Sequence, residues 1–215
     1  MSSKALMRCW YAALAALGAF ALAGTATLTI KHDRSLPNFF SYFTVESNLL
    51  VLVTAVLAVF GRLWDRTAIR ILRLAALTGI TITGVIYGTV IAPHTNPQGI
   101  ELVNDVILHY LVPTLAVLGF VLVGPRIRFL RSDLAFMAWP GVWILYTMVR
   151  GAVSHPGFPG LNGAKSRYPY GFLDVNAHGW GSVLPAILAV TALLICVASA
   201  YIWASRHLGN TAKAA

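Results

Sequence analysis

The stretch FFSYFTVESNLLVLVTAVLAVF, residues 39–60, decides the fold class of this chain because it is long and predominantly apolar. At about 1.5 Å of rise per residue, a helix over this stretch covers about 33 Å, which is enough to cross the hydrocarbon core of a bilayer. Near its start it carries Thr44, Glu46 and Asn48. Ionisable and hydrogen-bonding groups at membrane depth are costly, so they mark a candidate functional site.

The whole chain has the composition of a membrane protein. It is 58% hydrophobic and 11% charged, whereas soluble domains are about 25% charged. Six segments are apolar and long enough to span a bilayer, namely 9–30, 39–60, 71–91, 103–123, 134–153 and 180–204. Because little sequence lies outside them, we predict an all-α fold, a six-pass transmembrane helical bundle that forms one domain over residues 1–215.

The basic residues predict the orientation of this bundle. Six spans would place 11 of the 16 lysines and arginines on the side of the two termini, and 5 on the other side. Because the more positive side faces the cytoplasm, we predict a cell-membrane protein with both termini cytoplasmic. The alternative is a cleavable signal peptide ending near Ala23, which would leave five spans. The basic residues are not interleaved with aromatic residues, so we predict no nucleic-acid partner.

A second polar stretch, NDVILHYLVP, begins at Asn104 and places Asp105 and His109 inside the fourth span. If both helices run inward, Thr44 and His109 lie at similar depths, about 7–9 Å below the outer ends. Residues four apart share a helical face, so Thr44 lies above Asn48 and Asp105 lies above His109. The two stretches therefore predict one polar layer in the outer half of the bundle.

Other spans contribute polar residues to the same outer layer, namely Tyr87, Tyr146 and Arg150. The cytoplasmic half of the spans carries comparatively few polar side chains. A through-pore needs polar groups at both ends, so this asymmetry favours a cavity that opens to the outer leaflet or the exterior. We expect Arg150 to pair with Glu46 across the bundle, and Asp174 is its alternative partner or an acid that faces the site.

The longest connection, residues 154–179, is external and rich in glycine and proline. Loops longer than about 12–15 residues in a compact protein are usually functional or disordered. The aromatic segments YPY at 168–170 and FLD at 172–174 favour a lid folded over the outer surface. The alternative is a passive loop with interfacial tyrosines.

Metal and cofactor chemistry is not predicted. Cys9 and Cys196 lie within spans and lack the spacing of metal ligands. The external histidines His94, His155 and His178 do not form an HxxxH-like pattern that would bring ligands together. We therefore expect no metal site and no cofactor.

Five segments of the chain, FSYFTVESNLL, RLAALTGITITGVIY, NDVILHYLVP, WPGVWILYTMVRG and YPYGFLDV, together resemble a group of bacterial six-helix membrane proteins. The resemblance covers nearly the whole chain. That group is distantly similar to the eukaryotic androgen-induced-gene family, whose members are multi-pass threonine hydrolases that cleave fatty acid esters of hydroxy fatty acids. The resemblance implies Thr44 as the nucleophile and His109 as the base. Where that family often has a second histidine, this chain has Asp105.

The residue chemistry is compatible with this implication. A threonine hydroxyl becomes a nucleophile when a base lies within hydrogen-bond reach, and imidazole accepts a proton near neutral pH. By the logic of a catalytic triad, Asp105 would orient His109. The candidates for binding the substrate or stabilising its oxyanion are Asn48, Asn104, Tyr87, Tyr146, Arg150 and Asp174.

We therefore predict a membrane lipid esterase that takes an acyl ester from the bilayer, with membrane lipids as its partners and no oligomeric state implied. The purely structural alternative is that Thr44 bonds back to its own helix and His109 bridges helices. A non-catalytic protein that binds a lipid, quinone or small molecule in the same pocket is the second prediction. A proton-coupled carrier that uses Glu46, Asp105 and His109 is the third prediction. The scarcity of polar side chains in the cytoplasmic half of the spans disfavours it.

Overall fold

The structure is a computed structural model that describes residues 2–61, 66–125, 127–159 and 165–211. Most of this part of the chain is helical, which confirms the predicted all-α class. Five helices of the described residues are long and apolar enough to cross a membrane, namely Ser3–Lys31, Phe43–Phe60, Thr67–His94, Gly99–Val123 and Trp180–Leu208. These helices overlap five of the six predicted spans.

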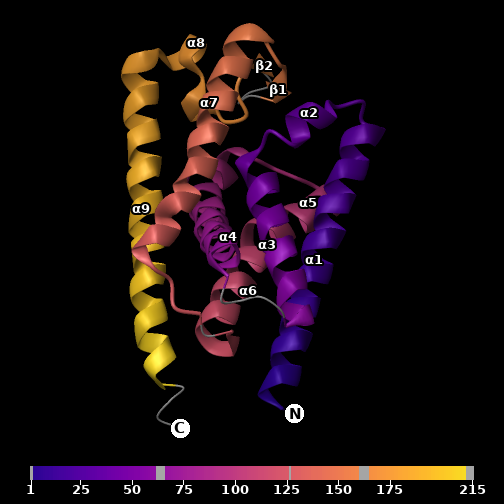
Figure 1. The fold of residues 1–215 in the computed structure, drawn as a ribbon. Coiled ribbons are helices and arrows are strands. Elements are labelled where there is room, and N and C mark those ends of the chain that lie inside the picture. The colour runs from indigo at the N-terminus through magenta and orange to yellow at the C-terminus, as the bar shows by residue number, and fades with distance from the viewer. Residues whose placement is uncertain (1, 62–65, 126, 160–164, 212–215) are drawn as a thin grey trace.

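Figure 1 labels the main elements in chain order. The first half contains α1 (Ser3–Lys31), α2 (Leu36–Phe39), α3 (Phe43–Phe60), α4 (Thr67–Ile86), η1 (Tyr87–Ile91) and η2 (Ala92–His94). The next long helix is divided into α5 (Gly99–Val106), η3 (Ile107–Leu111), α6 (Val112–Leu118) and η4 (Gly119–Val123). The rest contains η5 (Arg131–Met137), α7 (Ala138–Val153), β1 (Phe158–Pro159), β2 (Lys165–Ser166), η7 (Gly171–Leu173), α8 (Val175–His178) and α9 (Trp180–Thr211). Elements η1, η3 and η4 are π turns, and η2, η5 and η7 are 3₁₀ turns.

The described residues begin and end at the same end of the bundle. Figure 1 shows the start of α1 and the end of α9 there, whereas α2, α8 and the short antiparallel pair of β1 and β2 lie at the opposite end. Helix α1 packs on α3, α3 on α4, and α4 on α9, so α4 is central. The core that these helices form with α6 includes the fully buried side chains of Leu14, Leu74, Ile80 and Val112.

Helix α7 differs from the predicted span 134–153. It is α-helical over 16 residues, Ala138–Val153, and follows a 3₁₀ segment over Arg131–Met137. At about 1.5 Å per residue the α-helical part is about 24 Å long, which is shorter than a hydrocarbon core of about 30 Å. It nevertheless exposes an apolar stripe whose members are between 53% and 72% exposed, namely Val142, Leu145, Val149 and Val153.

Pro113 shapes the segment that carries His109. A proline has no N–H with which to bond the carbonyl four residues earlier, which here belongs to His109. The residues before it, Ile107–Leu111, form the π turn η3, and π turns are frequent at functional sites. Gly84 of α4 lies against this turn, because a Cβ placed on it would be 3.3 Å from the carbonyl oxygen of His109. Glycine therefore permits α4 to pack closely on η3.

The long connection after α7 folds back over the bundle. Tyr168 and Leu173 are 4% and 1% exposed, and they pack with the fully buried Val183 of α9. Gly151 permits this packing, because a Cβ placed on it would overlap the ring of Tyr168. For the described residues, the predicted packing of the loop against the bundle is confirmed. Residues 160–164 of the loop lie outside the described residues.

Candidate functional site

A cavity of about 310 Å³ lies between α3, α4, α7 and α9, beneath the loop segment that contains η7. Ligand pockets have volumes of about 300–1,000 Å³, so this cavity has room for part of a lipid. The lining is mostly apolar, and includes Phe43, Ile82, Ile86, Trp143, Ile144, Phe172, Leu173, Ile187, Val190 and Leu194. The polar side chains of the lining are Thr44, Thr83, Tyr87, Tyr170 and Thr191.

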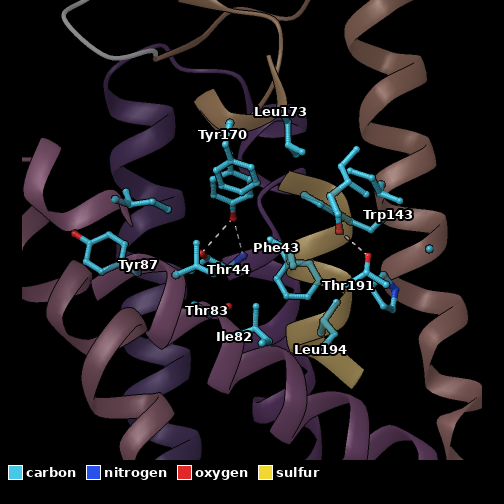
Figure 2. Close-up of a pocket in the computed structure, with 18 of the residues that line it drawn as sticks. Phe43, Thr44, Ile82, Thr83, Tyr87, Trp143, Tyr170, Leu173, Thr191 and Leu194 are labelled. Carbon is cyan, nitrogen blue, oxygen red and sulfur yellow. Dashed lines mark hydrogen bonds between the residues drawn. The ribbon is translucent and has the colours of Figure 1, made fainter. Parts of the chain in front are cut away.

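Thr44 lies on the cavity wall in the first turn of α3, where it is 9% exposed. Its N–H donates to the hydroxyl oxygen of Tyr170 over 3.3 Å, and its Oγ1 is 3.4 Å from the same oxygen. Figure 2 shows Tyr170 pointing from the loop down onto Thr44. The nucleophile candidate is therefore covered by a loop tyrosine.

The Tyr170 hydroxyl is a neutral partner for Thr44. Burial raises the pKa of Tyr170, and the charge of Glu46 raises it further. Tyr170 therefore stays protonated at neutral pH and is a poor proton acceptor. In this arrangement Tyr170 holds Thr44 but does not activate it as a nucleophile.

The other wall hydroxyls are bonded within the bundle. Thr83 Oγ1 lies 2.8 Å from Ser47 Oγ, and Thr191 donates to the carbonyl oxygen of Ile187 at 2.8 Å. Because these hydroxyls already have partners, they add little polarity to the cavity. Thr44 differs from them in that its side-chain partner belongs to the loop.

His109 forms a cluster with Asp105 and Tyr87. The carboxylate Oδ1 of Asp105 lies 3.1 Å from His109 Nδ1, which confirms the predicted contact across one helical turn. Tyr87 donates to Asp105 Oδ2 over 2.5 Å, and its ring stacks on His109 with centroids 3.6 Å apart. Within the described part of the chain, His109 Nε2 makes no hydrogen bond. Nδ1 also lies 3.0 Å from the backbone carbonyl oxygen of Asp105. When Nδ1 carries the proton and donates to Asp105, Nε2 is the atom able to accept another.

Thr44 and His109 lie on neighbouring helices that Asn48 connects. Asn48 Nδ2 donates to the carbonyl oxygens of Thr44 and Leu108, at 2.8 and 3.2 Å. Tyr87 belongs to the cavity wall, whereas His109 behind its ring is not among the lining residues. Figure 2 shows the Tyr87 hydroxyl pointing away from Thr44. The structure thus brings the two stretches together, with Thr44 bonded to Tyr170 and His109 bonded to Asp105.

Two predicted substrate-binding amides are engaged in helix packing. Both N–H groups of Asn48 are used by backbone carbonyls, and its Oδ1 is buried without a hydrogen-bond partner in the described residues. Asn104 is 2% exposed and faces α1, since a Cβ placed on Gly24 would be 2.8 Å from its Nδ2. Neither amide lines the cavity.

The expected ion pair between Glu46 and Arg150 is wrong. Glu46 Oε2 accepts a hydrogen bond of 2.6 Å from Trp139 Nε1, because the α7 residue that reaches it is an indole. Arg150 instead donates to Asn38 and Ser41.

Asp174 is also not the partner of Arg150. It accepts from Ser166 Oγ at 2.7 Å and from the backbone N–H groups of Asn176 and Ala177, so it caps α8. Tyr146 is 44% exposed and bonds Ser41. Neither Tyr146, Arg150 nor Asp174 is among the lining residues of the cavity.

Sequence reasoning did not assign Tyr170, Trp143 or Phe172 to the site, although the aromatic loop motif pointed to the region. No family model matches the chain, and neither a curated protein nor a solved structure matches it. The family resemblance therefore stays a prediction. Among the described residues, no group of three or more His, Cys, Asp or Glu side chains is arranged to hold a metal ion.

Proposed function

We propose that this protein is an integral membrane hydrolase of acyl esters, with Thr44 as nucleophile and His109 as general base. One observation carries the proposal. The Thr44 hydroxyl lies on the wall of an apolar, loop-covered cavity, next to a helix on which Asp105 holds an imidazole. The substrate class is an ester with an acyl chain, because the lining is mostly apolar.

The membrane topology is part of this proposal. Helix α7 would be the sixth crossing, completed by η5 and with its stripe of exposed valines and leucine facing lipid. Six crossings agree with the position of the start of α1 and the end of α9 on one side of the bundle (Figure 1). With 11 of the 16 basic residues assigned to that side, the termini would be cytoplasmic and the cavity would lie in the outer half.

An acyl chain would enter the cavity from the bilayer beside Gly141 of α7. Gly141 lines the cavity and is itself exposed. A Cβ placed on it would meet nothing within 4 Å, so the wall is open at this point. This lateral entrance would let a lipid reach Thr44 without leaving the membrane.

In the proposed reaction, Thr44 Oγ1 attacks the ester carbonyl carbon while His109 Nε2 takes the hydroxyl proton. Asp105 stabilises the resulting imidazolium, and the N–H of Thr44 is placed to donate to the oxyanion. The alcohol leaves with the proton from His109, and water then hydrolyses the acyl-threonine with His109 as the base. This sequence requires Tyr170 to release Thr44 and Tyr87 to move aside, so the structure would be the closed form.

A covalent probe tests the proposal. The purified protein would be treated with an alkyl fluorophosphonate, and its turnover of a long-chain ester would be measured in parallel. We expect labelling and turnover to be lost in Thr44→Val and in His109→Ala. The matched control is Thr191→Val, which removes another wall hydroxyl, one that is bonded to its own helix. A wild-type protein that is neither labelled nor active on esters would overturn the proposal.

Non-catalytic lipid binding is the second candidate function, and one observation favours it. The Thr44 hydroxyl is bonded to Tyr170, and His109 is stacked behind Tyr87 rather than lining the cavity. Under this alternative, the protein binds an acyl lipid equally well in wild type, Thr44→Val and His109→Ala, and none of the three turns it over. Under hydrolysis, only the wild type consumes the bound ester.

A further inference from the structure

We infer that Arg150 forms a binding site for the phosphate of a membrane phospholipid, on the outer surface of the bundle and apart from the cavity. Arg150 lies in the last turn of α7. Its Nη2 donates to Asn38 Oδ1 at 2.7 Å, its Nη1 donates to Ser41 Oγ at 3.1 Å, and its guanidinium lies 5.5 Å over the ring of Phe158. All three of these partners are neutral.

The charge of Arg150 therefore has no counter-ion within the described residues. Two other arginines each have a carboxylate partner. Arg34 lies 3.5 Å from Glu101, and Arg70 lies 3.1 Å from Asp133. A guanidinium has five N–H donors, and the bonds to Asn38 and Ser41 leave others available. The side chain is half-buried and held from three sides, so it is positioned before a ligand arrives.

Tyr146, one turn earlier on α7, borders the same site. Its hydroxyl is 2.9 Å from Ser41 Oγ, which also accepts from Arg150, and the tyrosine is 44% exposed. Ser41 donates its own proton to the carbonyl oxygen of Pro37 at 2.6 Å. Tyr146 is therefore the donor to Ser41 in this network, and its hydroxyl could donate to a phosphate oxygen instead.

The surface of α7 next to this pair is suited to an acyl chain. Val142, Leu145 and Val149 are 66%, 64% and 53% exposed, and they follow one another at helical spacing. A phospholipid whose chain lies along this stripe places its phosphate at the end of α7, where Arg150 is. Arginine binds phosphate through directed N–H donors, which makes a lipid phosphate the fitting counter-ion at this depth. The inference rests on the proposed membrane position of α7 and does not depend on hydrolysis.

Photochemical labelling in lipid bilayers tests this site. A phosphatidylglycerol with a diazirine near the top of its acyl chain would be crosslinked to the reconstituted protein, and the labelled peptides would be mapped by mass spectrometry. We expect label on the part of α7 between Leu145 and Val153 in the wild type. Loss of one basic contact to an anionic lipid should lower this label about fivefold in Arg150→Gln.

Three controls make the result specific. Arg34 lies at the same end of the bundle and already has a carboxylate partner, so Arg34→Gln should keep the α7 label. Thr44→Val should also keep this label, whether or not hydrolysis occurs. Arg150→Lys keeps the charge and should retain most of the label, which matters if Arg150→Gln does not fold. Label of equal strength in a folded Arg150→Gln, or a loss in Arg34→Gln equal to the loss in Arg150→Gln, overturns the inference. If Arg150→Gln does not fold, loss of the label in a folded Arg150→Lys overturns it. Full displacement of the lipid by inorganic phosphate would assign the site to free phosphate and overturn the lipid as its source.

Discussion

Gly141→Leu is the substitution that should separate access to the cavity from stability of the fold. Gly141 lines the cavity, is exposed, and has nothing within 4 Å of the place where a Cβ would stand. The leucine should therefore fit without a clash. Leucine is a better helix former than glycine by roughly 0.5–1 kcal/mol, so the free energy of unfolding should stay equal or rise slightly.

The effect on acyl binding follows from the volume that the leucine occupies. Its side chain would take the room of about three methylene groups of a bound chain, each worth about 0.8 kcal/mol when the chain enters the cavity from water. The loss of about 2–3 kcal/mol corresponds to a dissociation constant raised roughly 30- to 140-fold. A radiolabelled ester with an acyl chain short enough to dissolve as monomers in water, titrated onto the detergent-solubilised protein, measures this constant directly.

Gly181→Leu is the matched control for this experiment. Gly181 lies in α9, also has nothing within 4 Å of an added Cβ, and is not among the lining residues of the cavity. We expect its variant to bind the ester like the wild type. Wild-type affinity in Gly141→Leu, or equal losses in both variants, would refute the assignment of Gly141 to the entrance.

Two further predictions concern the loop over the cavity. Gly151→Ala places a methyl group into the ring of Tyr168. We therefore expect the free energy of unfolding, measured by chemical denaturation, to fall by about 1–3 kcal/mol. An unchanged free energy of unfolding would contradict the packing of the loop on α7. Burial raises the pKa of Tyr170, so its stabilising contribution is complete below the unfolded pKa of about 10 and is lost as the pH rises above it. Thermal melts between neutral and alkaline pH should therefore fall less steeply in Tyr170→Phe than in the wild type, and parallel curves would count against this reading.

Features that depend on neighbours along one helix were predictable from the chain. The apolar length of the spans predicted the helical class, because a helix has a fixed rise per residue. Asp105 and His109 meet because residues four apart share a face, and the structure has them 3.1 Å apart. The aromatic loop was recognisable as a packed segment, since tyrosine and phenylalanine stabilise a fold by leaving water.

Contacts between distant segments were decided by the tertiary structure. Glu46 bonds Trp139, 93 residues away, whereas the sequence favoured Arg150 as its partner. Opposite charge alone does not determine which side chain is brought close when the helices pack. Tyr170 covers Thr44 across 126 residues, and no local pattern specifies that approach. The amino-acid sequence by itself therefore determined the helices and the positions of the polar groups along them. Only the packing of α3, α4, α7 and α9 decided that Thr44 faces a cavity, and only the packing of η1 on η3 placed His109 behind Tyr87. Helix orientation depends on every side chain at the interfaces.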